Sequence, residues 1–263
     1  MLDQITPVIL TLNEAPNIVR ILERLTWARD VVVVDSLSQD DTAELASRFP
    51  NTRVVPRKYD ELAIQWNFGL HETDIRTEWI LALDADYIAT DELIEEIKKL
   101  DPPAGVGGYQ ASFTYCVWGK RLAGSLYPPV TVLFRKEGAR YRQDGHAHRI
   151  VVPEGLSVVP LQARMLHDDW KPLSTWLRSQ HNYMLIEARM IHKTPWAQLR
   201  WSDRIRKLRV VAPFAVLLYA LIYKGGLFQG RAGWFYAFQR SIAEMVLALH
   251  LFTEDLRPGS LEP

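Results

Sequence analysis

Cysteine is almost absent from this sequence, because Cys116 is the single cysteine among 263 residues. One thiol cannot close an internal disulfide, and it cannot supply the several sulfur ligands of a cysteine-based zinc site. A disulfide-stapled secreted domain is therefore excluded, and the composition is consistent with a reducing compartment. Residues 1–7 also lack the basic and apolar regions of a secretory signal, since Asp3 stands among them.

Two common phosphate-binding loops are missing as well. No G-x-G-x-x-G follows the first apolar run at 5–12, and no G-x-x-x-x-G-K-[S/T] occurs anywhere. The first loop is typical of dinucleotide-binding proteins and the second of P-loop nucleotide hydrolases. Both classes lose support, so a nucleotide bound by this chain must be held by other groups.

Apolar runs long enough to span a membrane are also missing. The stretch at 210–223 is almost wholly apolar, but its 14 residues fall short of the roughly 20 that a spanning helix needs. A second apolar stretch at 233–252 is interrupted by charged residues, and basic residues at 200–209 precede the pair. We expect peripheral membrane contact through residues 196–252, as a helical hairpin in the interface. The alternative is a helical dimer or an appendage that packs on the core.

The net charge of zero hides an uneven distribution. Residues 1–100 hold 10 Lys and Arg against 19 Asp and Glu, whereas residues 101–263 hold 21 against 12. A basic half suggests nucleic acid or an anionic membrane as a partner. The positive charge adjoins apolar helices and not a stacking platform for bases, and the chain has nine tryptophans, most of them in its later half. The membrane is therefore favoured and nucleic acid is not expected.

Apolar runs alternate with helical patterns in the first 100 residues. We expect strands at 5–12, 31–34, 52–56 and 79–83, and helices at 17–26, 42–49, 62–71 and 91–100. Near-continuous apolar strands between helices predict an α/β fold, a mostly parallel sheet with helices on both faces. From Pro172 the pattern becomes helical. We therefore expect one domain at 1–170, with halves 1–100 and 101–170, and a helical extension at 171–263.

The fourth expected strand ends on two carboxylates, Asp84 and Asp86, one residue apart. Both would point to the same side if the strand persisted, where they repel each other unless a cation joins them. Mg²⁺ or Mn²⁺ takes one or two carboxylates and completes its shell with substrate phosphates. The pair therefore suggests a metal–diphosphate site. The alternative is an Asp helix cap and a solvated turn.

Polar residues also end the first two expected strands. Asn13 and Glu14 follow the first strand, and Asp35 follows the second. The carboxyl ends of parallel strands lie on one edge of the sheet, where open α/β sheets bind their ligands. We therefore expect these side chains and the Asp84–Asp86 pair to line one cleft.

These residues resemble the motifs of family 2 glycosyltransferases, enzymes of the GT-A fold. The branch most similar to this chain adds glucose to the inner core of bacterial lipopolysaccharide. The matching residues are Thr11-Leu12-Asn13-Glu14, Val33-Val34-Asp35-Ser36, Gln65 with Asn67, Leu83-Asp84-Ala85-Asp86, Tyr127-Pro128, Phe134-Arg135 and Gly230-Arg231-Ala232-Gly233.

The resemblance implies roles for these positions. Thr11, Asn13, Glu14 and Asp35 would hold the base and ribose of the nucleotide, and Gln65 and Asn67 would lie near the nucleotide or donor sugar. Asp84 and Asp86 match the DxD-type motif of the family. Asp86 is then the candidate for direct contact with Mg²⁺ or Mn²⁺, and Asp84 is its donor-side partner.

An inverting transferase also needs a general base to deprotonate the acceptor hydroxyl. The branch is expected to supply it from an acid upstream of a His-Glu pair. Asp144 fits the acid, but the pair is replaced by His146-Ala147-His148. We therefore expect Asp144 to be the base and His146 or His148 to contact metal or phosphate, or to lie in an ordinary surface loop. Tyr87 is a second departure, since many relatives carry an acid there.

The sequence thus predicts a metal-dependent inverting transferase that moves a hexose from a UDP-sugar to a cell-envelope glycan or lipid such as lipopolysaccharide core. We expect it in the cytoplasm, peripheral on the inner face of the cytoplasmic membrane, either alone or as a homo-oligomer. The alternatives are a polyprenyl-phosphate glycosyltransferase and a non-catalytic nucleotide-sugar-binding protein.

Overall fold

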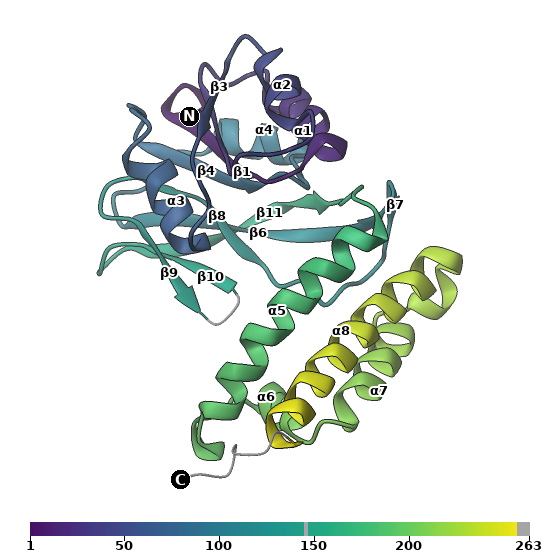
Figure 1. Ribbon diagram of the computed structural model, residues 1–263. Coiled ribbons are helices and arrows are strands. Elements are labelled where there is room, and N and C mark those ends of the chain that lie inside the picture. The colour runs from purple at the N-terminus through teal and green to yellow at the C-terminus, as the bar shows by residue number, and fades with distance from the viewer. Residues whose placement is uncertain (145–146, 257–263) are drawn as a thin grey trace. The chain divides into compact units, whose positions relative to one another are not determined.

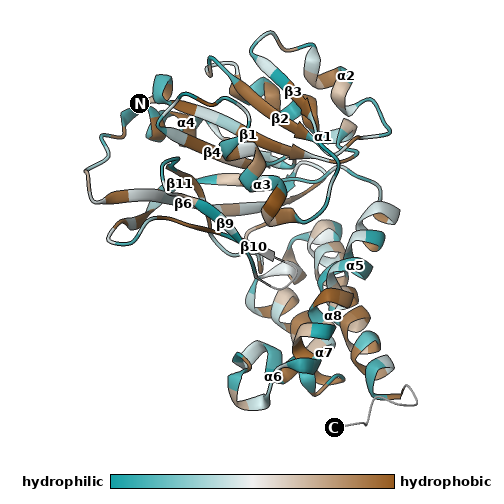
Figure 2. Ribbon diagram, turned by 60° about the vertical axis from the view of Figure 1, so that its left-hand side comes forward, coloured by the Kyte–Doolittle hydropathy of each residue, from teal (hydrophilic) through white to brown (hydrophobic). Residues whose placement is uncertain are grey.

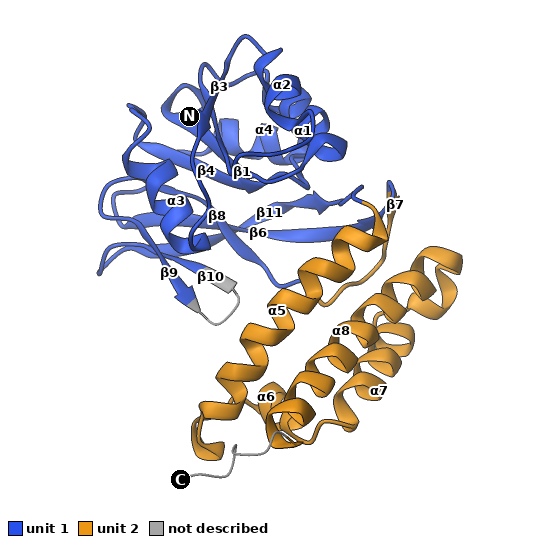
Figure 3. Ribbon diagram, in the orientation of Figure 1, with its two compact units in different colours: residues 1–119, 127–144, 148–171 blue, residues 120–126, 145–147, 172–263 orange. Residues whose placement is uncertain are grey.

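The computed structural model of the protein describes residues 1–144 and 147–256 (Figure 1). The chain forms two compact units (Figure 3). Unit 1 holds residues 1–119, 127–144 and 148–171, and unit 2 consists mainly of residues 120–126 and 172–256. The segment 120–126 belongs with the helices although it lies within the range expected for the first domain.

Unit 1 is built on a mixed sheet in the order β3-β2-β1-β4-β8-β6-β11-β5. Its strands are β1 (Ile5–Thr11), β2 (Val31–Asp35), β3 (Thr52–Pro56), β4 (Trp79–Asp84), β5 (Tyr87–Ile88), β6 (Val106–Val117), β8 (Val130–Arg135) and β11 (Ser157–His167). The first four strands are parallel. Strand β8 runs antiparallel to both β4 and β6, and β11 runs parallel to β6.

Helices cover both faces of this sheet. The main ones are α1 (Ala15–Leu22), α2 (Thr42–Ser47), α3 (Leu62–His71) and α4 (Asp91–Lys99). Short 3₁₀ turns lie at Leu2–Gln4 and Glu23–Leu25, and β9 (Arg140–Asp144) and β10 (Ala147–Val151) form a separate two-stranded sheet.

Two apolar clusters show why the strands have no polar face. Successive strand residues point to opposite sides, so Val8 packs with α3 whereas its neighbour Ile9 packs with α1 and α4. Val32 and Val33 divide in the same way. A strand buried on both faces needs apolar residues at every position. The predicted α/β class, with a mostly parallel sheet covered on both faces, is confirmed.

Unit 2 is helical. Its elements are β7 (Lys120–Arg121), α5 (Leu173–Lys193), a 3₁₀ turn (Trp196–Gln198), α6 (Trp201–Lys207), α7 (Val211–Leu218), a π-helical turn (Tyr219–Tyr223), a 3₁₀ turn (Gly226–Phe228) and α8 (Gly230–Leu256). Helix α8 packs on α5 through Leu247 and Leu251, and on the π turn through Ala237. Among the described helices, none combines the length and the apolar character that crossing a bilayer requires.

A buried ion network explains why Glu244 interrupts the apolar pattern of α8. The Arg206 guanidinium lies 2.7 Å from Glu244, 3.3 Å from Asp203 and 3.5 Å from Glu187. All three carboxylates are buried. Buried charges persist only when they are paired, so Glu244 joins α8 to α6 through Arg206.

Candidate functional site

The carboxyl ends of β1, β2 and β4 lie next to one another in unit 1. Thr11 is the register partner of Asp35, and Leu10 is the partner of Asp84. Strand β1 lies between β2 and β4, and the chain proceeds from there toward opposite edges of the sheet. Such a reversal opens a crevice at the strand ends, the usual ligand site of open α/β sheets.

Asp35 organises the two loops on one side of this crevice. Its carboxylate is 3% exposed and accepts hydrogen bonds from Thr11 Oγ1 at 2.8 Å, Ser38 N at 2.8 Å and Ser38 Oγ at 2.6 Å. The backbone N–H of Asn13 donates to Ser38 Oγ at 2.8 Å, and Asn13 Oδ1 accepts from Gln39 N at 2.8 Å. Asp35 therefore holds the loops after β1 and β2 together as one surface.

The two polar residues of α3 lie in different surroundings. Gln65 is fully buried and donates to Ser36 Oγ at 3.1 Å, so it lies beneath the loop that follows β2. The amide of Asn67 donates to Tyr141 O at 3.0 Å and accepts from Tyr141 N at 2.8 Å. Asn67 thus joins α3 to β9. Gln65 thus contacts the residue that directly follows Asp35.

Asp86 follows β4 and lies beside a residue from the far end of unit 1. Its Oδ2 is 3.8 Å from Nε2 of His167, which ends β11. Asp86 Oδ1 is buried and has no hydrogen-bond partner among the described residues. Burial raises the pKa of Asp86, His167 and Lys171 lower it, and Asp84 and Asp169 raise it further. A buried carboxylate oxygen without a donor is costly, and a cation would relieve that cost.

Aromatic rings hold His167 in place. Tyr115 stacks on the imidazole with ring centroids 4.7 Å apart, and Tyr127 meets it edge-on at 4.4 Å. Tyr87, the residue that replaces an acid found in many relatives, is hydrogen-bonded through its hydroxyl to Tyr127. Burial raises the pKa of Tyr87 well above its ordinary value. Tyr87 therefore places an uncharged ring beside Asp86 and adds no charge to the site.

Glu14, Lys171 and Asp169 form a second charged group next to Asp86. Lys171 Nζ donates to Glu14 Oε1 at 2.5 Å and lies 3.7 Å from Asp169 Oδ2. Burial raises the pKa of Glu14 to about 7, with a smaller raising effect from Asp86, although Lys171 opposes the shift. Burial alone would lower the pKa of Lys171, but Glu14, Asp86 and Asp169 together raise it above its usual value. Lys171 therefore neutralises the excess of carboxylates in the crevice.

Asp169 and Lys171 were not predicted to belong to this site. The segment His167-Asp168-Asp169-Trp170-Lys171 follows a strand, which is the same signal that pointed to Asp35 and Asp84. Its place in the crevice depends on long-range contacts: Asp168 binds Arg20 of α1 at 2.5 Å, and Asp169 accepts from Asn17 at 2.9 Å. These contacts join residues about 150 positions apart in the chain, so no local sequence pattern predicts them.

The donor set fits a divalent cation bound together with a diphosphate. Among the described residues, no three His, Cys, Asp or Glu side chains are grouped closely enough to enclose a metal by themselves. Mg²⁺ and Mn²⁺ do not need such a cage, because substrate phosphates and water complete their shells. Asp86, with its unpartnered buried oxygen, and the adjacent His167 are the side chains that would hold the ion.

The structure does not describe the side chains of three predicted site residues. Asp144 ends β9 and His148 belongs to β10. Their side chains, and the whole of His146, lie outside the described residues. The predictions for Asp144, His146 and His148 therefore stay predictions.

A sequence profile identifies the chain. The profile of the family described as "Glycosyl transferase family 2" matches residues 6–154, more than half of the sequence. The chain belongs to glycosyl transferase family 2. The match covers β1 to β10, with Asp35, Asp84 and Asp86, and it ends before His167, Asp169 and Lys171. The resemblance to this family is confirmed, whereas no comparison supports the narrower lipopolysaccharide-core branch.

Solved structures show a more distant likeness to this family 2 member. Residues 1–349 of TarS from S. aureus, in complex with UDP-GlcNAc, share 13% identity with a TM-score of 0.43, over 96% of this chain and 91% of that one. Glucosyl-3-phosphoglycerate synthase from Mycobacterium tuberculosis, in complex with Mn²⁺, UDP-Glc and phosphoglyceric acid, shares 16% identity with a TM-score of 0.47, over 72% and 79%. The family assignment rests on the profile match and not on these values.

Proposed function

We propose that this family 2 glycosyltransferase is a metal-dependent inverting enzyme that moves a hexose from a UDP-sugar to a cell-envelope glycan or lipid, such as lipopolysaccharide core. The observation that carries the metal and donor assignment is Asp86. Its Oδ1 is buried and has no partner among the described residues, and its Oδ2 lies 3.8 Å from His167 Nε2. The side chain follows β4, next to the reversal of strand order. A carboxylate in that state accommodates a cation with an anionic partner, which a nucleoside diphosphate supplies.

Different residues of this site bind different parts of the donor. The loops that Asp35 holds together present Asn13 and Ser38 to the base and ribose. Asp84 and Asp86 lie next to the diphosphate, with Lys171 as a further positive charge toward its oxygens. A metal held by Asp86 and His167 would supply Lewis-acid stabilisation of the departing nucleoside diphosphate. His167 is kept in one orientation by Tyr115 and Tyr127.

A thermal-shift panel tests the donor and metal assignments together. UDP-sugars, the class held by both similar proteins above, are compared with GDP-sugars, each with and without Mn²⁺. A ligand at about 100 times its Kd stabilises the native state by roughly 2.7 kcal/mol, so we expect a rise of several degrees in Tm. The rise should need the UDP-sugar and Mn²⁺ together. Equal shifts with the nucleotide sugar alone would contradict the metal assignment.

Hydrolysis separates the enzyme from a non-catalytic binding protein. Slow release of UDP from the UDP-sugar that gives the largest shift is expected in the presence of Mn²⁺, since water replaces the missing acceptor. Binding without any turnover, with or without envelope glycans and lipids as acceptors, would favour the non-catalytic alternative.

Asp144 is proposed as the general base, on the resemblance to the family's acceptor-side motif. Strand β9 is joined to α3 through Asn67, so Asp144 belongs to the same unit as the donor residues. For Asp144→Asn we expect transfer to fall about 10³-fold, because general bases contribute roughly 10²–10⁴. The Kd for the UDP-sugar, measured by titration calorimetry with Mn²⁺, should stay unchanged.

The matched control for that variant is Asp101→Asn, at an exposed position of unit 1. It should change neither transfer nor Kd. If Asp144→Asn instead weakens donor binding as much as it slows transfer, Asp144 is a donor ligand and the base lies elsewhere.

A further inference from the structure

Unit 2 exposes large apolar side chains in two stripes. On α8 they are Trp234, Phe238, Ile242, Met245 and Leu249, at spacings of three or four residues, which places them along one side of the helix. On α7 and the π turn they are Val211, Phe214, Leu218 and Ile222. A helix of a globular protein normally turns such a stripe toward a core. No other part of the described chain covers these two stripes.

The two stripes border the contact between the helices, so they form one surface. Ser241 of α8 donates to Pro213 O of α7 at 3.0 Å, and Ala237 packs on Ala220 and Leu221. One residue further along α8 turns the side chain by about 100°. Phe238 and Ile242, which directly follow Ala237 and Ser241, therefore lie beside the contact with α7. Brown, apolar segments mark both helices in Figure 2.

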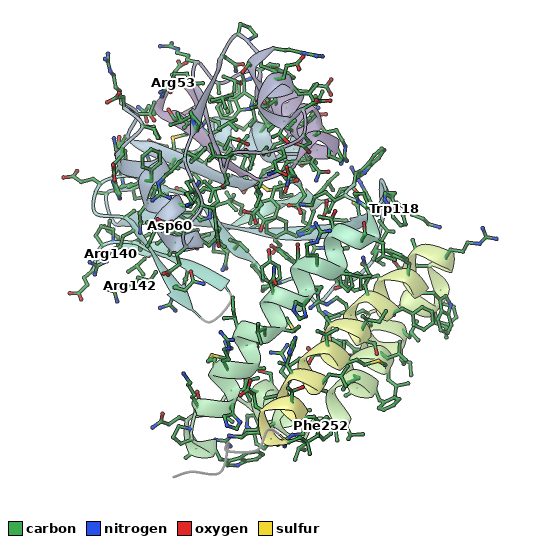
Figure 4. All side chains as sticks on the ribbon, viewed as in Figure 1. Arg53, Asp60, Trp118, Arg140, Arg142 and Phe252 are labelled. Carbon is green, nitrogen blue, oxygen red and sulfur yellow. The ribbon has the colours of Figure 1, made fainter. Side chains whose placement is uncertain are left out.

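The turn between α7 and α8 extends this apolar face. Phe228 is 88% exposed and Tyr223 is 74% exposed. The rings of Tyr219 and Tyr223 stack at 4.8 Å, and the ammonium of Lys224 lies 5.5 Å and 5.6 Å from their centroids. Aromatic rings with a cation above them suit the boundary between apolar chains and charged headgroups. Phe252 lies near the other end of α8 (Figure 4). Its ring centroid is 5.7 Å from the guanidinium of Arg209.

The charge that residues 196–252 present to solvent has one sign, although Asp255, beyond this segment on α8, pairs with Arg209. Residues 196–252 contain eight Lys and Arg but only two acids, Asp203 and Glu244. Both acids are buried and paired with Arg206, so this segment presents no carboxylate to solvent. Arg200 and Arg231 are exposed. An apolar face with a basic border is complementary to anionic lipid, where each cation near the surface contributes about 1 kcal/mol.

We propose that this face of unit 2, formed by α7, the turn at 219–228 and one side of α8, docks on the surface of a bilayer that contains anionic lipids. The face lies in the interface, because the described helices do not meet the requirements of a spanning segment. A second copy of the chain fits less well, since a symmetric pairing would set the basic border of one face against that of the other.

Flotation of the full-length protein with vesicles tests this docking without any substrate. Vesicles of phosphatidylcholine alone are compared with vesicles of phosphatidylcholine and phosphatidylglycerol in equal parts. We expect binding to the anionic vesicles to be at least about tenfold stronger at low salt, and to weaken as salt screens the headgroups. The outcome does not depend on transfer, so it stands apart from the proposed reaction.

Matched substitutions identify the face. Ile222→Ser and Phe228→Ser should each lower the partition coefficient for anionic vesicles about tenfold or more, because each removes a large apolar side chain from the contact. Ile64→Ser, at an exposed position of α3 in unit 1, should leave it unchanged. Lys224→Glu should lower binding to anionic vesicles and not to neutral ones. Circular dichroism checks that every variant is folded.

Three results would overturn the proposal. The first is no binding to anionic vesicles at low salt. The second is equal binding by Ile222→Ser and Ile64→Ser. The third is a stable dimer in light scattering that Ile222→Ser converts to a monomer, which would assign the face to a second copy of this chain.

Discussion

Replacing Asp86 with Asn is expected to reduce transfer about 10³-fold or more while leaving the protein folded. The amide keeps the shape of the side chain but removes the charge that a divalent cation requires, and loss of Lewis-acid stabilisation costs several kcal/mol in the transition state. Burial raises the pKa of Asp86, so its ionised form opposes folding above that pKa when no metal is bound. Asp86→Asn should therefore have a Tm at least as high as the unmodified protein without metal.

The measurement combines kcat with thermal shifts at neutral pH. The rise in Tm on adding Mn²⁺ with a UDP-sugar should disappear in Asp86→Asn and persist in the exposed control Asp101→Asn. Retention of full activity by Asp86→Asn would remove Asp86 from the metal site. An unchanged Mn²⁺-dependent rise in Tm would show that Asp86 does not bind the metal.

Gly233→Ala is expected to destabilise unit 2 by about 3 kcal/mol or more, which is the upper range for overpacking. A Cβ at Gly233 would lie 2.1 Å from the backbone oxygen of Gly226, far closer than van der Waals contact allows. A Cβ added at Gly226 would likewise lie 2.8 Å from the backbone oxygen of Ala220, so the turn and the start of α8 pack closely. The turn that carries Phe228 should therefore open.

Gly105→Ala is the matched control, because a Cβ there meets no atom within 4 Å. We expect Gly233→Ala to lower the Tm of unit 2 by roughly 10 °C and to expose its helices to limited proteolysis, whereas Gly105→Ala should behave like the unmodified protein. Equal melting of the two variants would show that the contact between the turn and α8 is not tight in solution.

Much of unit 1 could be predicted from the sequence, because its signals are local. The run Val31–Asp35 is apolar until its last residue, so it predicts both a buried strand and a polar strand end. The same holds for β4 and Asp84. Since parallel strands share the edge at which they end, Asp35 and Asp84 were expected at one crevice, and the register places them there. Side-chain roles did not follow so directly: Asn67 binds the backbone of Tyr141.

The α/β class, the family and the acidic edge of the sheet therefore follow from the amino-acid sequence, since all three depend on apolar periodicity and on short motifs. The residues that complete that edge follow from the packing of the fold. This packing brings His167 beside Asp86 and Lys171 beside Glu14, across about 80 and 157 positions of the chain. Within residues 1–144 and 147–256, the α7–α8 face also stays exposed. Such pairings depend on how β11 and the helices pack, and packing between distant segments leaves no periodic signal in either of them.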